Sequence, residues 1–141
     1  MNLILCILLW LVAWPASALA AQAANGNAAP TDQRNAAAVQ QVLAGQRDDA
    51  NAAWWGFDPD DSTAALQGAI DSHAKRVRVP YMGAPWIVRP IALRSDQEID
   101  FDPGVVILAK KGEFRGPGDS LFTATGVNNL TLRGYGATLR M

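Results

Sequence analysis

The sequence is poor in the residues on which disulfides and many active sites depend: it has one cysteine and one histidine. Cys6 lies in an apolar N-terminal block and is lost if that block is cleaved, so no disulfide is expected in the mature chain. His73 has no serine, cysteine or aspartate at a spacing that suggests a catalytic group, so we do not expect it to take part in catalysis.

The sequence also lacks an excess of charge of either sign. Twelve Lys and Arg residues face thirteen Asp and Glu residues, and the formal net charge is −1. A protein that binds nucleic acid through its phosphates carries a clustered basic excess. Nucleic acid is therefore excluded as an expected partner.

The first twenty residues contain no charged side chain. They hold an apolar block at 3–14, followed by small residues that end in an A-x-A pattern at Ala20. This pattern predicts a signal peptide at residues 1–20, cleaved near Ala20, and hence a secreted or periplasmic protein with no membrane attachment after cleavage. A membrane anchor is the alternative, but the block is shorter than the about 20 residues that a spanning helix needs.

Residues 21–53 form an Ala/Gln/Asn-rich leader that is expected to be partly helical. Within it, residues 35–44 have the composition of a helix, with Asn35 as N-cap. Residues 47–51 are predicted to be a polar connection. The third segment, residues 54–141, differs because it carries the strands.

A second helix is predicted at residues 63–72, where apolar side chains recur at helical spacing. Asp58, Asp60 and Asp61 precede it, as carboxylates do at the positive end of a helix dipole. A calcium loop is the alternative for these three residues, but they lack the glycine and distal glutamate of that motif. We expect this helix to cap the strands that follow, with an aromatic flank made of Trp54, Trp55 and Phe57.

One unit of two short strands joined by a turn occurs three times. At residues 98–101 polar and apolar residues alternate, Pro103-Gly104 forms a turn, and residues 105–108 are a continuous aliphatic run. A third short apolar segment closes the first two units. The remaining segments of the three units are 77–79, 86–88, 91–93, 121–124, 130–132 and 137–139.

Repeats of roughly 20–30 residues with several short strands each are typical of a solenoid. The gaps between the strands are too short for the helices of a βαβ sheet, and the leucine spacing of a leucine-rich repeat is absent. The fold class expected for residues 54–141 is therefore an all-β solenoid, a parallel β-helix of about three rungs with an N-terminal capping helix. Because the third rung lacks its third strand, we expect it to be C-terminally incomplete and part of a longer protein.

Two motifs are similar to a known family. The block 56–71, G-F-D-P-D-D-S-T-A-A-L-Q-G-A-I-D, followed by V-R-V-P at 77–80, resembles the N-terminal entry of the pectate-lyase-like superfamily. The block 128–139, N-N-L-T-L-R-G-Y-G-A-T-L, resembles a recurrent rung of the same superfamily. The resemblance implies a right-handed parallel β-helix and covers residues 54–141.

The superfamily includes secreted polysaccharide lyases, polygalacturonase-like glycosidases and phage tailspikes. The resemblance implies a polysaccharide substrate or ligand, further rungs of the same protein as partners, and catalytic residues on middle rungs beyond Met141. The main expectation is an entry segment of a polysaccharide lyase or glycoside hydrolase, inactive by itself. The alternatives are a non-catalytic adhesin or carbohydrate-binding protein and a tailspike-like element, which the signal peptide disfavours.

Candidate binding residues lie in the insertion at residues 110–120. Lys110, Lys111 and Arg115 are cations that can meet an anionic sugar, and loops on a rigid scaffold often carry function. The alternative, which we favour, is an ordinary surface loop. Aromatic residues are a second class of candidate, since Trp54, Trp55 and Trp86 can stack on sugars, but we expect them to pack over the cap.

Glu98, Asp100 and Asp102 alternate along one strand and point to one side of it. Residues at i and i+2 are roughly 7 Å apart, which is near the carboxylate separation of an inverting glycosidase and suits a shared Ca²⁺. We predict instead that they form a wet, non-catalytic strand face. No metal or cofactor is expected in this chain, and Ca²⁺ enters only as an option for a longer protein.

Overall fold

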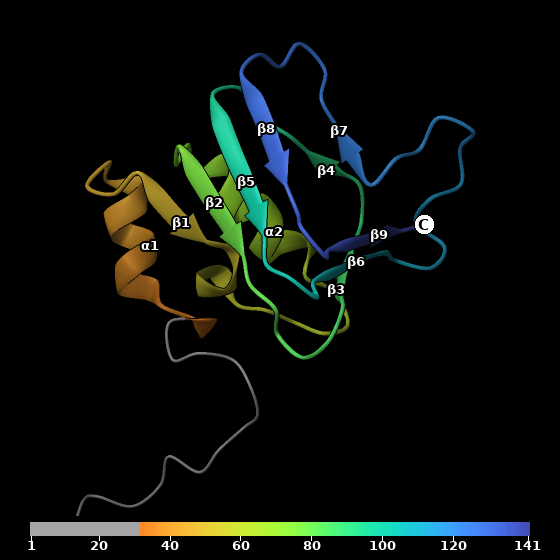
Figure 1. The fold of residues 1–141 in the computed structure, drawn as a ribbon, viewed down its shortest axis with the longest axis horizontal. Coiled ribbons are helices and arrows are strands. Elements are labelled where there is room, and N and C mark those ends of the chain that lie inside the picture. The colour runs from red at the N-terminus through yellow and green to blue at the C-terminus, as the bar shows by residue number, and fades with distance from the viewer. Residues whose placement is uncertain (1–31) are drawn as a thin grey trace, which may run out of the picture.

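The computed structural model describes residues 32–141, so the predicted signal peptide and the start of the leader lie outside the described residues. No helix in this part of the chain is long and apolar enough to cross a membrane. Figure 1 shows two helices beside a set of short strands. In chain order the elements are α1 (Ala36–Leu43), β1 (Asp49–Asn51), the 3₁₀ helix η2 (Ala52–Trp55), α2 (Thr63–Asp71), β2 (Arg76–Val79), β3 (Trp86–Val88), β4 (Ile91–Ala92), β5 (Gln97–Phe101), β6 (Val106–Ala109), β7 (Phe122–Thr123), β8 (Leu130–Arg133) and β9 (Thr138–Arg140).

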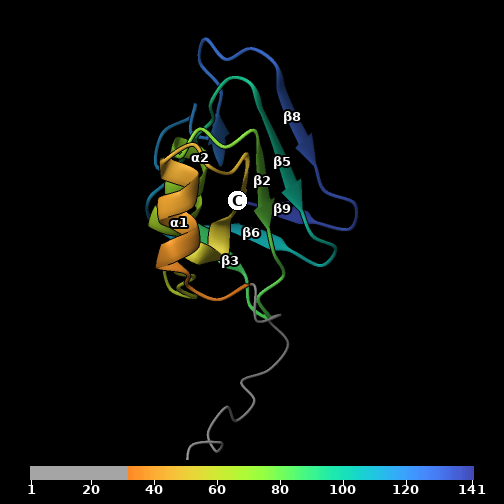
Figure 2. The same ribbon diagram turned by 90° about the vertical axis from the view of Figure 1, so that its left-hand side faces the viewer.

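The described strands form three sheets, with the orders β1-β2-β5-β8, β3-β6-β9 and β4-β7. Every strand pair among them is parallel. From β2 onward the chain visits the first, second and third sheet in turn and then returns to the first, so consecutive strands never pair with each other (Figures 1 and 2). The eight strands predicted from the repeats are confirmed, with boundaries that agree within one or two residues.

The register of the first sheet places like residues opposite one another. Val77 pairs with Ile99, and Ile99 pairs with Leu132, on the side that faces the interior. Arg76 and Glu98 pair on the outer side. Because successive strand residues point to opposite faces, this register stacks the apolar side chains inside and the charged ones outside.

The strand patterns in the sequence predict ten interior residues, which are Val77, Val79, Ile99, Phe101, Val105, Ile107, Leu121, Leu130, Leu132 and Leu139. The structure divides them into two groups. Most are buried, and Leu130 is half-buried. In contrast, Leu132 is 45% exposed and Leu139 is 52% exposed, because β8 and β9 are the last described strands of their sheets. The predicted interior residues that are buried are Val77, Val79, Ile99, Phe101, Val105, Ile107 and Leu121.

The described part of the leader, residues 32–53, is more ordered than its composition suggests. Helix α1 is confirmed, with the side chain of Asn35 accepting a hydrogen bond from the Ala38 amide at 3.0 Å. The prediction of a polar connection at residues 47–51 is wrong, because β1 pairs with β2 there. Ala50 is the only apolar residue of β1 and is buried, and one small residue is too weak a signal of alternation to mark a strand.

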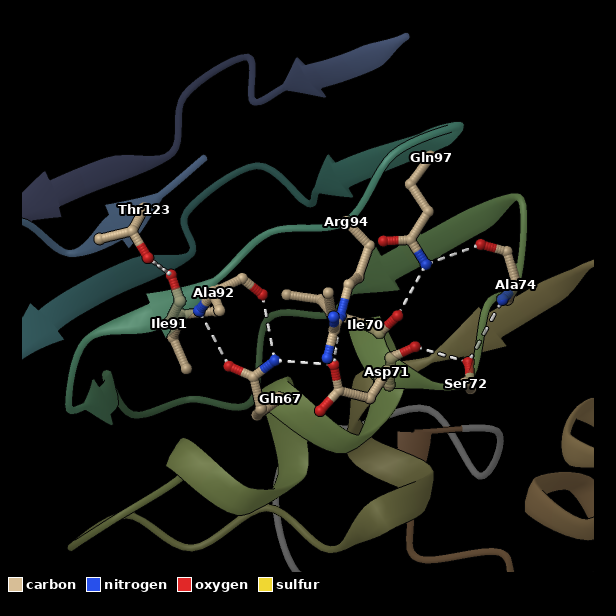
Figure 3. A network of polar contacts seen from close by, with 11 residues as sticks. Gln67, Ile70, Asp71, Ser72, Ala74, Ile91, Ala92, Arg94, Gln97 and Thr123 are labelled. Carbon is tan, nitrogen blue, oxygen red and sulfur yellow. Dashed lines mark hydrogen bonds and ion pairs between the residues drawn. The ribbon is translucent and has the colours of Figure 1, made fainter. Parts of the chain in front are cut away.

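Helix α2 and the residues before it cover one edge of two sheets. The Gln67 side chain donates to the Ala92 carbonyl and accepts from the Ala92 amide, both at 3.0 Å, as a neighbouring strand would (Figure 3). On β3, the Ser62 amide donates to the Ile87 carbonyl at 2.7 Å, and the Thr63 hydroxyl accepts from the Arg89 amide just past the strand at 2.9 Å. The first sheet ends on this side with the short strand β1, and α1 lies beside it (Figure 1).

The C-terminal end of α2 is attached to β5 by a buried side chain. The Nε2 of Gln97 donates to the carbonyls of Ile70 at 2.8 Å and Ala74 at 2.9 Å (Figure 3). Arg94 adds an ion pair to Asp71 at 2.8 Å. These contacts hold the helix over the end of the stacked interior, as expected of a cap, and the predicted helix at residues 63–72 is confirmed.

The opposite edges of the sheets differ. Within residues 32–141, no strand pairs with the outer edges of β7, β8 and β9. We call this side of the molecule the open end. Large apolar side chains exposed at this end are Leu132, Leu139 and Met141. The described part of the chain therefore has one covered end and one open end.

Candidate functional site

The three cations proposed as sugar ligands lie in and beside the loop after β6. Lys110 is half-buried, and its Nζ lies 2.7 Å from the Asp61 carboxylate. Arg115 is exposed but donates from Nε to the Gly112 carbonyl at 2.6 Å. Lys111 is exposed. Two of the three side chains are therefore held by other groups of this chain, which favours the surface-loop interpretation.

Asp61 is the most heavily bonded carboxylate at this place. It accepts from the Thr63 amide at 3.1 Å and from the Thr63 hydroxyl at 2.5 Å, and it also pairs with Arg89 at 3.1 Å. The Lys110 ammonium, together with the Thr63 donors, lowers the pKa of Asp61 far below its usual range. Asp61 thus joins the start of α2 to the end of β6, a contact between distant residues that the local sequence does not reveal.

Replacing Asp61 with asparagine is expected to lower the free energy of unfolding by up to about 1 kcal/mol at pH 7, because asparagine can still accept from Thr63 but loses the partly exposed ion pairs with Lys110 and Arg89. Because the folded state lowers the pKa of this carboxyl, its contribution is present above the unfolded value of about 3.9 and is lost as the pH falls below it. Urea melts at pH 7 and pH 3 measure this. A difference between parent and D61N that is as large at pH 3 as at pH 7 would contradict the ion-pair role.

A second group of polar residues covers the outer side of the first sheet, and we call it the charged face. Arg76 lies 3.4 Å from Glu98, and Arg133 lies 2.5 Å from the same carboxylate. A hollow of about 330 Å³ lies at its edge, lined in part by Arg76, Glu98 and the acidic end of β1. The charged face consists of Asp49, Arg76, Arg78, Glu98, Asp100, Asp102 and Arg133.

The carboxylates of the charged face are neutralised by arginines. Arg78 holds Asp102 through two hydrogen bonds, at 3.0 and 2.5 Å, and also binds the buried Asp32 at 2.7 Å. Asp100 is less well compensated, since its cation, Arg76, is 3.8 Å away. Burial, and then the neighbouring Glu98 charge, raise the pKa of Asp100. The expectation of a wet strand face needs a correction, since Glu98, Asp100 and Asp102 are half-buried and paired.

The three tryptophans of residues 32–141 lie in the packed part of the molecule. Trp86 is fully buried, with its ring centroid 4.9 Å from that of Phe57 in an edge-to-face contact. Trp54 is buried and has the Arg47 guanidinium 4.7 Å above its ring centroid. Trp55 is half-buried against α2. The prediction that these side chains pack, rather than stack on sugars, is confirmed for Trp54 and Trp86.

Comparison with protein-family models, with curated proteins and with solved structures finds no match to this chain. The resemblance to the pectate-lyase-like superfamily therefore rests on the sequence motifs. Among residues 32–141 no three or more His, Cys, Asp or Glu side chains are grouped so as to hold a metal ion, and Asp58, Asp60 and Asp61 form no such group.

Proposed function

We propose that this chain is the N-terminal, capped segment of a secreted or periplasmic right-handed parallel β-helix protein that binds or acts on polysaccharide. Three parallel sheets that the chain visits in rotation support the solenoid part of the proposal. The two motifs at residues 56–80 and 128–139 support the link to polysaccharide, by resemblance alone.

The observation that carries the proposal is the difference between the two ends. At one end, Ser62 and Thr63 bond to the edge of the second sheet, Gln67 bonds to the edge of the third, and α1 lies beside β1, the edge strand of the first. The other edges lack partners among the described residues, with Leu132 and Leu139 exposed beside them. Solenoids cover their terminal coil and bury the other coils against neighbouring repeats. Further rungs of the same protein are the partners that suit the open end, and the catalytic groups of a lyase or hydrolase would lie on them.

A non-catalytic carbohydrate-binding or adhesin protein is the second candidate. It is favoured by the charged face, where arginines neutralise the carboxylates that the sequence singles out. A general base or nucleophile needs a carboxylate that is free to meet the substrate. Because Glu98 and Asp102 are held by arginines, we propose binding as the activity of the segment itself.

The proposal is tested by binding of the full chain to immobilised polysaccharides. We expect retention on at least one member of a panel that contains polygalacturonate, xylan and a neutral glucan, measured against an uncoated matrix. Ultraviolet detection of unsaturated products and an assay for reducing ends report lyase and hydrolase activity. Absence of retention on every member would contradict the proposed function.

The carboxylates of the charged face provide a separate prediction. The triple variant Glu98→Gln, Asp100→Asn, Asp102→Asn is expected to keep at least about half of the polysaccharide binding or turnover, because these groups hold arginines and not substrate. Circular dichroism checks that the variant is folded. A loss of several orders of magnitude in a folded variant would make these residues part of the site.

A further inference from the structure

We propose that Tyr81 and Tyr135 form a stacking site for a neutral polysaccharide chain, a ridge of two aromatic rings on one corner of the molecule. The inference rests on the proposed function and adds the place and the chemical class of the ligand. It begins from the aromatic side chains that remain accessible once Trp54 and Trp86 are buried. Tyr81 is 43% exposed and Tyr135 is 93% exposed.

The two tyrosines lie in equivalent turns. Tyr81 is in the turn from β2 to β3, and Tyr135 is in the turn from β8 to β9. The turn from β5 to β6 lies between them, as Figure 1 shows. The Gly104 amide in this middle turn donates to the Gly136 carbonyl at 3.0 Å, so the second and third turns are stacked like the strands they join.

The middle turn places a glycine beside the Tyr81 ring. A Cβ on Gly104 would lie 3.6 Å from Cδ2 of Tyr81, so the Tyr81 ring lies against this glycine. Gly104 has a φ of +85°, a conformation that favours glycine, and the turn therefore has a physical reason to lack a side chain there. No side chain stands at this position to separate a ligand from the Tyr81 ring.

Tyr135 points away from the interior. Gly134, the residue before it, takes the inner position, where a Cβ would lie 3.5 Å from the Cβ of Phe101. Tyr135 follows in the turn after β8, and its side chain is 93% exposed, so it does not pack into the interior. Further strands added to the open end would extend the sheets along the stacking direction and leave this outer side accessible.

The spacing suits an extended ligand. Neighbouring strands of a sheet are roughly 4.8 Å apart, and two such steps separate the turns by roughly 10 Å. That distance is comparable with the length of two sugar units in an extended polysaccharide. A tyrosine ring offers an apolar face to the C–H groups of a sugar and a hydroxyl that can bond to the sugar hydroxyls.

The surrounding charge favours a neutral chain over a uronate. Arg78 lies on β2, which leads into the Tyr81 turn, and it is already shared between Asp102 and Asp32. Its guanidinium is therefore balanced by two carboxylates. Because the ridge has no net positive charge, the charge of an anionic sugar would not strengthen binding there. Stacking on a tyrosine ring needs no charge and is open to any pyranose.

The experiment is affinity electrophoresis of the full chain in gels that contain a neutral glucan or xylan, with polygalacturonate as the anionic comparison. Protein is loaded at a concentration at which sedimentation shows monomer. We expect Tyr135→Ala and Tyr81→Ala each to weaken binding roughly 3- to 10-fold, the scale of an aromatic contact. Tyr135→Phe keeps the ring and is expected to stay within roughly twofold of the parent.

Met141→Ala is the matched control, because it removes an exposed apolar side chain at the same end without removing a ring. We expect it to bind like the parent. If the folded double variant Tyr81→Ala, Tyr135→Ala bound as tightly as the parent, the two tyrosines would not be the binding site, and the proposed function would be unaffected. Preference of the parent for polygalacturonate would overturn the neutral class of ligand. Failure of the parent to bind any polysaccharide would overturn both.

Discussion

Replacing Trp86 with alanine is expected to lower the free energy of unfolding by about 3–5 kcal/mol, as for large-to-small substitutions in a packed core. Trp86 lies on β3, is fully buried, and packs edge-to-face on Phe57. Its indole Nε1 also donates to the Pro80 carbonyl at 3.0 Å. The alanine would leave a cavity between the second sheet and the aromatic flank of the cap, and it would leave a buried carbonyl without this donor.

The measurement is equilibrium unfolding in urea, followed by circular dichroism. Trp86→Phe is the matched control, because it keeps an aromatic ring and removes the hydrogen-bond donor. We expect the phenylalanine variant to lose about 1–2 kcal/mol, the cost of an unsatisfied buried polar group. A cost below about 1 kcal/mol for the alanine variant would show that Trp86 does not occupy the core in solution.

The chain from residue 21 onward is expected to self-associate through its open end, or to melt without cooperativity. An unpaired strand edge is a template for another chain, and Leu132 and Leu139 lie exposed beside two such edges. The double variant Leu132→Lys, Leu139→Lys places charges on this apolar surface. Sedimentation velocity is therefore expected to shift from an associated species for the parent to the monomer for the variant.

Thr131→Lys is the control for the association. Thr131 lies on β8 between two interior-facing residues and pairs with Glu98 on the outer side. A lysine there adds the same charge without entering the apolar surface, and we expect association to persist. A parent chain that is monomeric by sedimentation and unfolds in a sharp, concentration-independent transition would contradict the open end as an association surface.

Local pattern was sufficient to predict β2 to β9 and the second helix, but not β1. The alternation at residues 98–101 led to β5, where Ile99 and Phe101 are buried between half-buried carboxylates. The helix at residues 63–72 followed from apolar spacing and from the acidic residues before it. In both cases the side chains that decide the structure are neighbours in the sequence, so a short window contains the whole signal.

The missed features depend on residues far apart in the chain. Gln67 acts as a strand edge for Ala92, and Asp61 binds Lys110, and neither contact has a local signal. The turns before β5 and β8 hold Asp96 and Asn129 at positive φ, a conformation these two residue types tolerate. A turn was predictable there, but the bond from Asn129 Nδ2 to the Asp96 carboxylate at 2.8 Å depends on the stacking.

The covered end described above limits how large an assembly of this chain can grow. Head-to-tail stacking into a fibre needs a free edge at both ends of each molecule. At the covered end Ser62 and Gln67 bond to the edges of β3 and β4, and α1 lies beside the short edge strand β1 (Figure 1). Two molecules can meet only open end to open end, about a twofold axis, with their strands antiparallel across the junction. Once two have met, no free edge is left for a third. The covered end therefore prevents a third molecule from adding, and the association predicted for this protein stops at a dimer.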